Sequence, residues 1–436
     1  MQTRIFAVVL SAALACAVFG PYIVGGVRVE QAVVYLAFAI LVPLNFRHLY
    51  RDGTYGYLLV WGSYLVTALI GLVLYRPPAN ARWDAGSTIA GMDNLLLPIA
   101  VMLVVWTSVP RVYAADTFRI VAQVLSVAMA ANGFITIIST FFDISPLLRI
   151  FWAPAGDVFT VGQNSVGNGR YSGLFNQPSE AGLLYGVAGL LAIFAWRHRQ
   201  VLLAVLVSFI FIGGMLTVSK VFLLGGLPLT VVYWFILRPR GTRPTVAFLC
   251  TFAVLLVIPI IVLQQWRGFA YLARLLPTAG IFDRIFASRY GDDAGIMNVI
   301  RELLSESPVY GVGVSGWKVP YDSGWVQALV LAGIIGFVAF AMIFVLMGIT
   351  AMKLPRNGLR SFGVLLTLLL VGASIAIPPL SANRVATIVW LLISLLVLIS
   401  EQGAKIFDFK ARAQGLKSRA KAEDPSQIST SEIGAS

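Results

Sequence analysis

Long apolar runs recur along the whole chain and are separated by short polar segments. Twelve such runs can be read, at residues 4–25, 32–45, 55–75, 94–109, 118–141, 180–196, 201–216, 221–237, 245–264, 324–349, 360–378 and 383–400. A helix needs roughly 20 apolar residues to cross a bilayer, and lipid offers no partners for unpaired backbone groups. The pattern predicts an all-α polytopic membrane protein with about twelve transmembrane helices, in which residues 1–400 form a single domain.

Basic residues gather on one side of this predicted topology. With both termini on the cytoplasmic side, the inner segments hold 19 of the 32 Lys and Arg residues but 7 of the 19 acids. The positive-inside bias therefore accounts for the sequence pI of about 9.9 without a nucleic-acid partner. Residues 401–436 form a basic cytoplasmic tail that we expect to be disordered, although it could also touch anionic lipid.

Two predicted outer loops are long, at about 142–179 and 265–323. The first contains an apolar patch, Pro146 to Ala153, that could lie flat at the interface. In the second, Ile296, Ile300, Leu303 and Leu304 repeat at helical spacing, and the pattern stops before Pro308. We expect this loop to be structured, with short helices lying over the mouth of the bundle.

The predicted spans carry almost no ionisable side chains, since Glu180 and Lys220 fall at predicted helix ends. Ion-coupled transporters usually place acids near the middle of the bilayer, often beside broken helices. Gly225 to Pro228 could break the eighth helix, but no charge accompanies it. The charges gather at one face instead, as expected of an interfacial enzyme.

The densest polar segment, Gly169 to Gly182, ends the first outer loop and opens the sixth span. Ser179 is a candidate N-cap, and Glu180 falls in the first turn, where an acid is favoured without any further role. Arg170 could form a two-pronged hydrogen bond to a phosphate. The alternative for Arg170 is a side chain that reaches the lipid headgroups.

Two more segments hold candidate chemistry. Lys220 follows a very short outer turn and could bind an anion or anchor the helix end. The large loop holds Arg289 and ends at Asp322, which could cap the tenth span or deprotonate a sugar hydroxyl. Both histidines, His48 and His198, fall in predicted inner loops, so we expect no histidine base or histidine-bound metal on the outer face.

In combination, these patterns resemble the O-antigen and exopolysaccharide polymerase family, often called Wzy-type, within the O-antigen ligase and polymerase superfamily. The matching pieces are Arg170 to Phe175 with Pro178, Leu216 and Thr217 with Ser219 and Lys220, and the large loop with Arg289, Pro308, Gly311 to Gly313, Asp322 and Ser323, followed by Gly333 to Gly336. The resemblance covers about residues 165–340. The family often has arginine where this chain has Lys220, and its ligase branch typically has histidine near the position of Asp322.

The resemblance implies a metal-independent glycosyltransferase bundle of the C class, without a cofactor, in the bacterial cytoplasmic (inner) membrane. It would join undecaprenyl-pyrophosphate-linked oligosaccharides, as both donor and acceptor, into O-antigen or another exopolysaccharide, with a chain-length regulator as a possible partner. Alternatives are an O-antigen ligase or a transporter of lipid-linked sugar. We assign pyrophosphate binding to Arg170, Lys220 and Arg289, and catalysis to Asp322 and Glu180. Further candidates for glycan contacts are Tyr171, Asn176, Tyr290 and Arg301.

Overall fold

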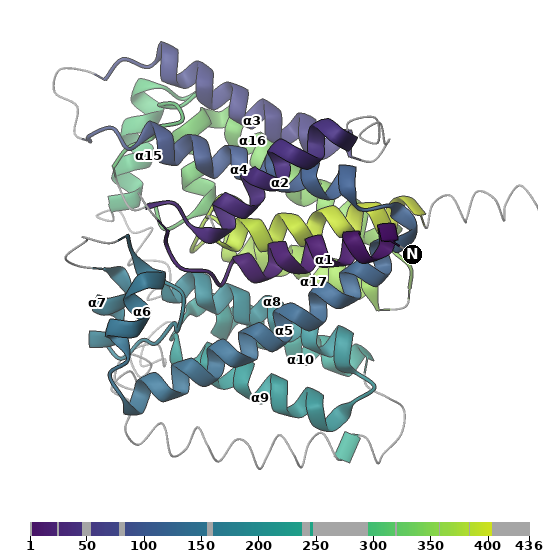
Figure 1. Cartoon of the computed structure of the whole chain (residues 1–436). Helices are drawn as coiled ribbons and strands as arrows, with labels where there is room; N and C mark the ends of the chain where they lie inside the picture. Colours follow the sequence, from purple (N-terminus) through teal and green to yellow (C-terminus); the bar gives the residue numbers. More distant parts are fainter. Residues whose placement is uncertain are drawn as a thin grey trace, which may run out of the picture.

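Apolar helices make up most of the protein in the computed structural model (Figure 1). The structure describes residues 2–23, 26–45, 54–77, 83–154, 160–237, 245–246, 295–318, 321–356, 358–382 and 384–402. Within these residues, six helices are long and apolar enough to cross a membrane. They are α3 (Tyr55–Leu74), α4 (Thr88–Ser108), α5 (Arg111–Phe141), α8 (Pro178–Trp196), α16 (Gly324–Lys353) and an unlabelled helix at Arg384–Gln402.

Five shorter apolar helices complete the described bundle. They are α1 (Gln2–Ala17), α2 (Val29–Asn45), α9 (Gln200–Leu216), the helix Phe222–Leu237, and α17 (Leu359–Ala373). Each of these helices coincides with one of the predicted runs, which confirms an all-helical fold with several candidate membrane spans. The run at 245–264 lies outside the described residues except at its first two positions, so the count of about twelve spans stays a prediction. Residues 403–436 of the predicted tail also lie outside them.

The helix Arg384–Gln402 forms the centre of the bundle and is the most deeply buried of the six long helices. It is the yellow helix that runs through the middle of Figure 1. Its Trp390 ring packs edge-on against Trp61 of α3, with the ring centroids 5.0 Å apart. Around it, α3 packs along α16, α2 along α4, and α5 along both α8 and α9. The core is therefore built from apolar side chains of helices that are far apart in the sequence.

The two ends of the bundle differ. The short helices α6 (Ser145–Trp152), α7 (Val161–Gly167) and α15 (Gly295–Glu306) lie at one end, which we call the loop end, and the N-terminus lies at the other (Figure 1). Near the N-terminus, Arg4 pairs with Asp116 at 2.8 Å and Arg111 pairs with Glu401. In the predicted topology, Arg4 stands at the cytoplasmic start of the first run, Arg111 and Asp116 lie in the inner segment 110–117, and Glu401 begins the cytoplasmic tail.

The apolar patch of the first long loop forms a short helix, α6, and whether it lies at a membrane interface stays a prediction. Leu148 and Trp152 are buried, whereas Leu147 and Ile150 on the other face are largely exposed. The indole N–H of Trp152 donates to the carbonyl of Gly173 at 2.9 Å. The patch thus holds the loop in place through one face of a short amphipathic helix.

The predicted helix of the second long loop is confirmed as α15, which ends at Glu306, two residues before Pro308. Its buried face consists of Ile296, Val299 and Leu303. The prediction that Leu304 belongs to this face is wrong, because its side chain is about half exposed. At i, i+3 and i+7, the three buried residues share one stripe of the helix, and Leu304 lies to the side of it.

Helix α16 is broken near its loop end. Ala332 and Gly333 leave the helical conformation, and Gly333 has a φ of 59°. The carbonyls of Val330 and Leu331, which the break releases, accept hydrogen bonds from the backbone of Val312 and Gly313. Residues 308–314 are therefore built into the gap in the helix, as glycines with positive φ at 311 and 313 permit.

A second irregularity lies where the sequence predicts a helix break. Residues Phe222–Gly226 form one turn of π-helix, η3, before α10 (Leu227–Leu237). Gly226 packs directly against Gly186 of α8, where an added Cβ would come within 2.8 Å of the facing Cα. The glycines thus allow close helix packing as well as the change of winding.

We expect Gly333→Ala to lower the melting temperature of the purified protein by several degrees. Its φ of 59° disfavours a side chain, and an added Cβ would lie 2.4 Å from the Val309 carbonyl carbon. Gly348 is the matched control, since it lies in the same helix and an added Cβ meets nothing within 4 Å. Gly348→Ala should leave the melting temperature unchanged or raise it, as alanine favours helix by about 1 kcal/mol over glycine. Equal melting temperatures for the two variants would contradict this account of the break.

Candidate functional site

The segment from Arg170 to Asn176 is fixed to its surroundings at nearly every residue. Asn132 of α5 accepts from the backbone N–H of Leu174 at 2.8 Å and donates to the carbonyl of Ser172 at 3.3 Å. Gly173 has a φ of 61° and packs on the Asn132 side chain, so that a Cβ would clash there. The segment is thus a rigid loop that presents Arg170 at the loop end of the bundle.

Arg170 is held beside the turn that leads to Lys220. Its Nε donates to the carbonyl of Thr217 at 3.2 Å, and the backbone N–H of Tyr171 donates to the carbonyl of Leu216 at 2.9 Å. Lys220 follows Thr217 by three residues. The structure therefore brings together two of the three cation-bearing segments that the sequence singles out.

Two of the candidate segments contain strained backbone. Among the described residues, Val218 (φ 49°) and Asp322 (φ 46°) are the non-glycine residues with positive φ. This conformation is particularly unfavourable for a β-branched residue such as valine. Strain of about 1–3 kcal/mol per residue persists where the surroundings impose it and tends to occur at functional sites. Val218 stands two residues before Lys220, and Asp322 is itself a residue that the sequence assigns to chemistry.

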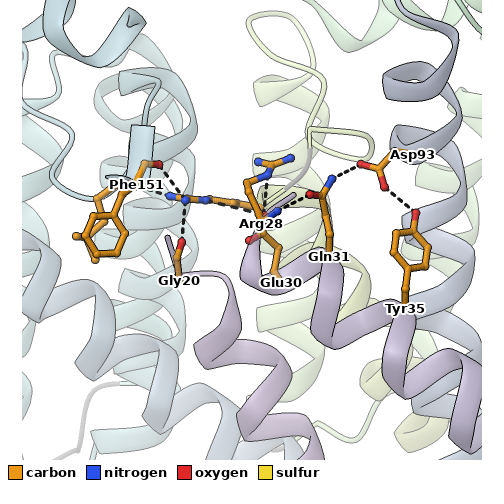
Figure 2. Close-up of polar contacts among 9 residues, drawn as sticks. Gly20, Arg28, Glu30, Gln31, Tyr35, Asp93 and Phe151 are labelled. Atoms are coloured by element: carbon orange, nitrogen blue, oxygen red, sulfur yellow. Dashed lines mark hydrogen bonds and ion pairs between the residues drawn. The ribbon is translucent and has the colours of Figure 1, made fainter. Parts of the chain in front are cut away.

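A buried ion cluster at the same end escapes the sequence analysis (Figure 2). The Glu30 carboxylate is fully buried and lies 3.1 Å from the Nε of Arg28 and 3.9 Å from the Nε of Arg384. The Arg384 side chain is itself 2% exposed. Its two Nη atoms donate to three carbonyls, those of Leu174 (2.7 Å), Gly20 (2.9 Å) and Phe151 (2.9 Å). Arg384 thus ties three separate segments to the start of the central helix.

The polar contacts continue into α2 and α4. The Arg28 backbone N–H donates to Gln31, Gln31 donates to Asp93, and the hydroxyl of Tyr35 donates to the other oxygen of Asp93 at 2.7 Å (Figure 2). Asp93 lies inside the long helix α4, which begins at Thr88, earlier than the predicted run. Asp93 is thus an acid within a long apolar helix, one residue before the predicted run, and Gln31 and Tyr35 satisfy its carboxylate.

Glu180 faces this cluster. It lies in the first turn of α8, as predicted, and interacts electrostatically with Arg28 and Arg384. Two guanidinium groups thus meet two carboxylates, those of Glu30 and Glu180, so the cluster is formally neutral. The prediction that Ser179 caps this helix is wrong, because the helix begins at Pro178 with Gln177 as its N-cap. Proline suits the first helical position, since its missing N–H would have no helical partner there.

Asp322 is exposed at the entry to α16. It does not cap this helix, because Ser323 is the N-cap and its side chain accepts from the backbone N–H of Val326 at 3.4 Å. Just before it, the Tyr321 hydroxyl accepts from the backbone N–H of Trp317 and donates to its carbonyl. Asp322 is therefore an exposed residue that directly follows a turn fixed by Tyr321.

The remaining candidates have mixed placements. Tyr171 is buried in a small apolar cluster with α9, and the side-chain oxygen of Asn176 accepts from the backbone N–H of Gly162 at 2.8 Å at the start of α7. Both side chains thus have a structural role in the loop. Arg301 lies on the exposed face of α15. Arg289 and Tyr290 lie outside the described residues, so their contribution to the site stays a prediction.

Comparison with known proteins gives no match to a family and no match among curated proteins. Within the described part of the chain, no group of three or more His, Cys, Asp or Glu side chains is placed to hold a metal ion. The function must therefore be argued from the arrangement of the residues themselves.

Proposed function

We propose that the protein is a membrane-embedded glycosyltransferase that joins lipid-pyrophosphate-linked oligosaccharides into a polysaccharide. The proposal includes a topology of about twelve spans, with both termini in the cytoplasm and the loop end on the outer face of the bacterial cytoplasmic membrane. The observation that carries it is the bond from Arg170 to the Thr217 carbonyl, which unites two cationic segments at the loop end.

The geometry suits the binding of a diphosphate. The bond from Nε fixes the plane of the Arg170 guanidinium, and a guanidinium with a fixed plane can bind phosphate oxygens in a two-pronged manner. Lys220 begins the next helix and brings a second positive charge to the same turn. Arg289 would supply a third charge from the large loop. In the reaction, the anomeric C–O bond to the pyrophosphate breaks, and the leaving group takes the bonding electrons.

Fixed cations would stabilise the negative charge that develops on this leaving pyrophosphate. The acceptor hydroxyl forms the new bond to the anomeric carbon and gives up its proton to a base. Asp322 is the first candidate for that base, since it is exposed at the loop end and held in a strained conformation. Glu180 is the second candidate. Its interactions with Arg28 and Arg384 explain an acid at this position equally well without a catalytic role.

Deleting the gene is the direct test of the proposal, with surface and lipid-linked glycans separated by gel electrophoresis. A polymerase deletion should leave single repeats and no ladder of longer chains, and a plasmid copy should restore the ladder. Finished polymer that is not attached to its acceptor would indicate a ligase instead. Repeats retained at the cytoplasmic face would indicate a transporter. An unchanged glycan profile would contradict all three functions.

A further inference from the structure

A cleft of about 530 Å³ opens at the loop end between the segment joining α3 to α4 and the segment after α15. Aromatic and polar side chains share its lining, among them Tyr75, Trp83, Asp84, Thr88, Ser315 and Trp317. Its volume falls within the range of about 300–1,000 Å³ found for small-molecule sites. We propose that this cleft binds a sugar ring of the glycan, an inference that rests on the proposed function.

The cleft is built by direct pairing of chain segments more than 200 residues apart. Ala85 forms an antiparallel bridge with Trp317, and the backbone N–H of Lys318 donates to the Asp84 carbonyl at 2.7 Å. The backbone N–H of Gly86 donates to the carbonyl of Gly316 at 3.0 Å. These bonds hold the two walls at a fixed separation, so the cleft is formed before any ligand enters.

The lining suits a saccharide. One face of a pyranose ring carries C–H groups that pack on aromatic rings, while its hydroxyls need donors and acceptors at the rim. Trp83 and Tyr75 are half-buried and offer ring surface, and Asp84, Thr88 and Ser315 offer polar groups. The Tyr75 ring is held in place by its hydroxyl, which donates to Glu306 of α15 at 2.7 Å. Burial, followed by this hydrogen bond, raises the pKa of Tyr75 to about 12, so the hydroxyl keeps its proton and its bond to Glu306.

A second cavity has a different lining. It has a volume of about 350 Å³ and is lined by apolar side chains of α15 and α16 such as Ile300, Trp325 and Phe337, with Ile375. Its lining offers almost nothing to sugar hydroxyls. The aromatic cleft, by contrast, is connected to the proposed base, since the Trp317 backbone is bonded to Tyr321, the residue before Asp322.

Saturation-transfer NMR on the purified full-length protein in detergent micelles tests the proposal. The probes are D-glucose, D-galactose, D-mannose, N-acetyl-D-glucosamine and L-rhamnose, with glycerol as a non-ring polyol. At least one sugar should give a signal that glycerol does not. Trp83→Ala should weaken this binding by about fivefold or more, and Trp83→Phe should keep most of it, because one aromatic contact contributes an effect of this size. Arg149→Ala, an exposed arginine on α6, is the control.

The proposal that the cleft binds sugar would be contradicted if the wild-type protein bound no sugar, or if the wild-type and Trp83→Ala proteins bound it equally. The glycan profile of the deletion strain separates this result from a failure of the proposed function. If sugar binding depends on Trp83 but deletion leaves the glycan profile unchanged, the cleft is a sugar site and the polymerase function is rejected. If deletion abolishes polymer but the wild-type and Trp83→Ala proteins bind sugar equally, the polymerase function is supported and the sugar site in the cleft is rejected.

Discussion

Arg384→Ala is expected to prevent stable folding of the bundle. The substitution leaves the buried Glu30 carboxylate with Arg28 alone and removes the donors from the carbonyls of Gly20, Phe151 and Leu174. Breaking a buried ion pair from one side costs about 3–5 kcal/mol, and each orphaned buried acceptor costs about 1–3 kcal/mol more. These sums are comparable with the whole stability of many proteins. We expect the variant to be absent from the monodisperse peak in size-exclusion chromatography.

Two companion variants make this result specific to the lost partners. Arg384→Lys keeps the charge but lacks the fork that spans three carbonyls, so it should be intermediate. Removing the facing charge as well, in the double variant Arg384→Met and Glu30→Leu, should be less harmful than Arg384→Met alone, because the carboxylate that pairs with Arg384 is then removed with it, and Arg28 still faces Glu180. A melting temperature of Arg384→Ala equal to that of the wild-type protein would show that the contacts of Arg384 contribute little to stability.

Arg170→Ala is expected to lower polymer formation by about 10²–10³-fold while the protein remains in the membrane at its normal level. This is the size of effect that follows the loss of one fixed group facing developing charge. The stability cost should be small, since one hydrogen bond to the Thr217 carbonyl contributes about 1 kcal/mol. The measurement is polymer length in membranes of a complemented deletion strain, with protein abundance read by immunoblot.

The control for this variant is again Arg149→Ala, which removes an exposed arginine at the same end of the bundle. Arg170→Lys should retain part of the activity, because lysine keeps the charge but binds phosphate as a single point. Lys220→Arg should stay active, since it exchanges one cation for another. Polymer of normal length from Arg170→Ala would remove this residue from the proposed site and, with it, the observation that carries the function.

The helices could be predicted because a membrane span needs only a long apolar run, which is a local property of the sequence. The helix ends were less predictable. Ser179 and Asp322 both have the right chemistry for a cap, but Pro178 and Ser323 decide where these helices begin. One residue changes the outcome at such positions, and several residues nearby can satisfy the same backbone groups.

The buried cluster illustrates what local patterns omit. Arg28 and Glu30 are two residues apart, but Arg384 comes from the far end of the chain, and it resembles any arginine that precedes an apolar run. The available signal was that two oppositely charged residues stand directly before the second span, where isolated charges are costly without partners. That signal indicates a missing partner but does not identify it. Arg170 and the Thr217 turn could be singled out because glycines, polar residues and a charge coincide at each.

The position of the central helix in the chain has a consequence for how the protein is made. The helix Arg384–Gln402, around which the others pack, is the last of the described helices to leave the ribosome. Until it is made, the surfaces of the earlier helices that it covers lack their partner, and the Glu30 carboxylate lacks one of its two arginines. The bundle can therefore pack completely only after residue 402 has been synthesised. A chain that ends before residue 384 lacks the helix that forms the centre of the bundle.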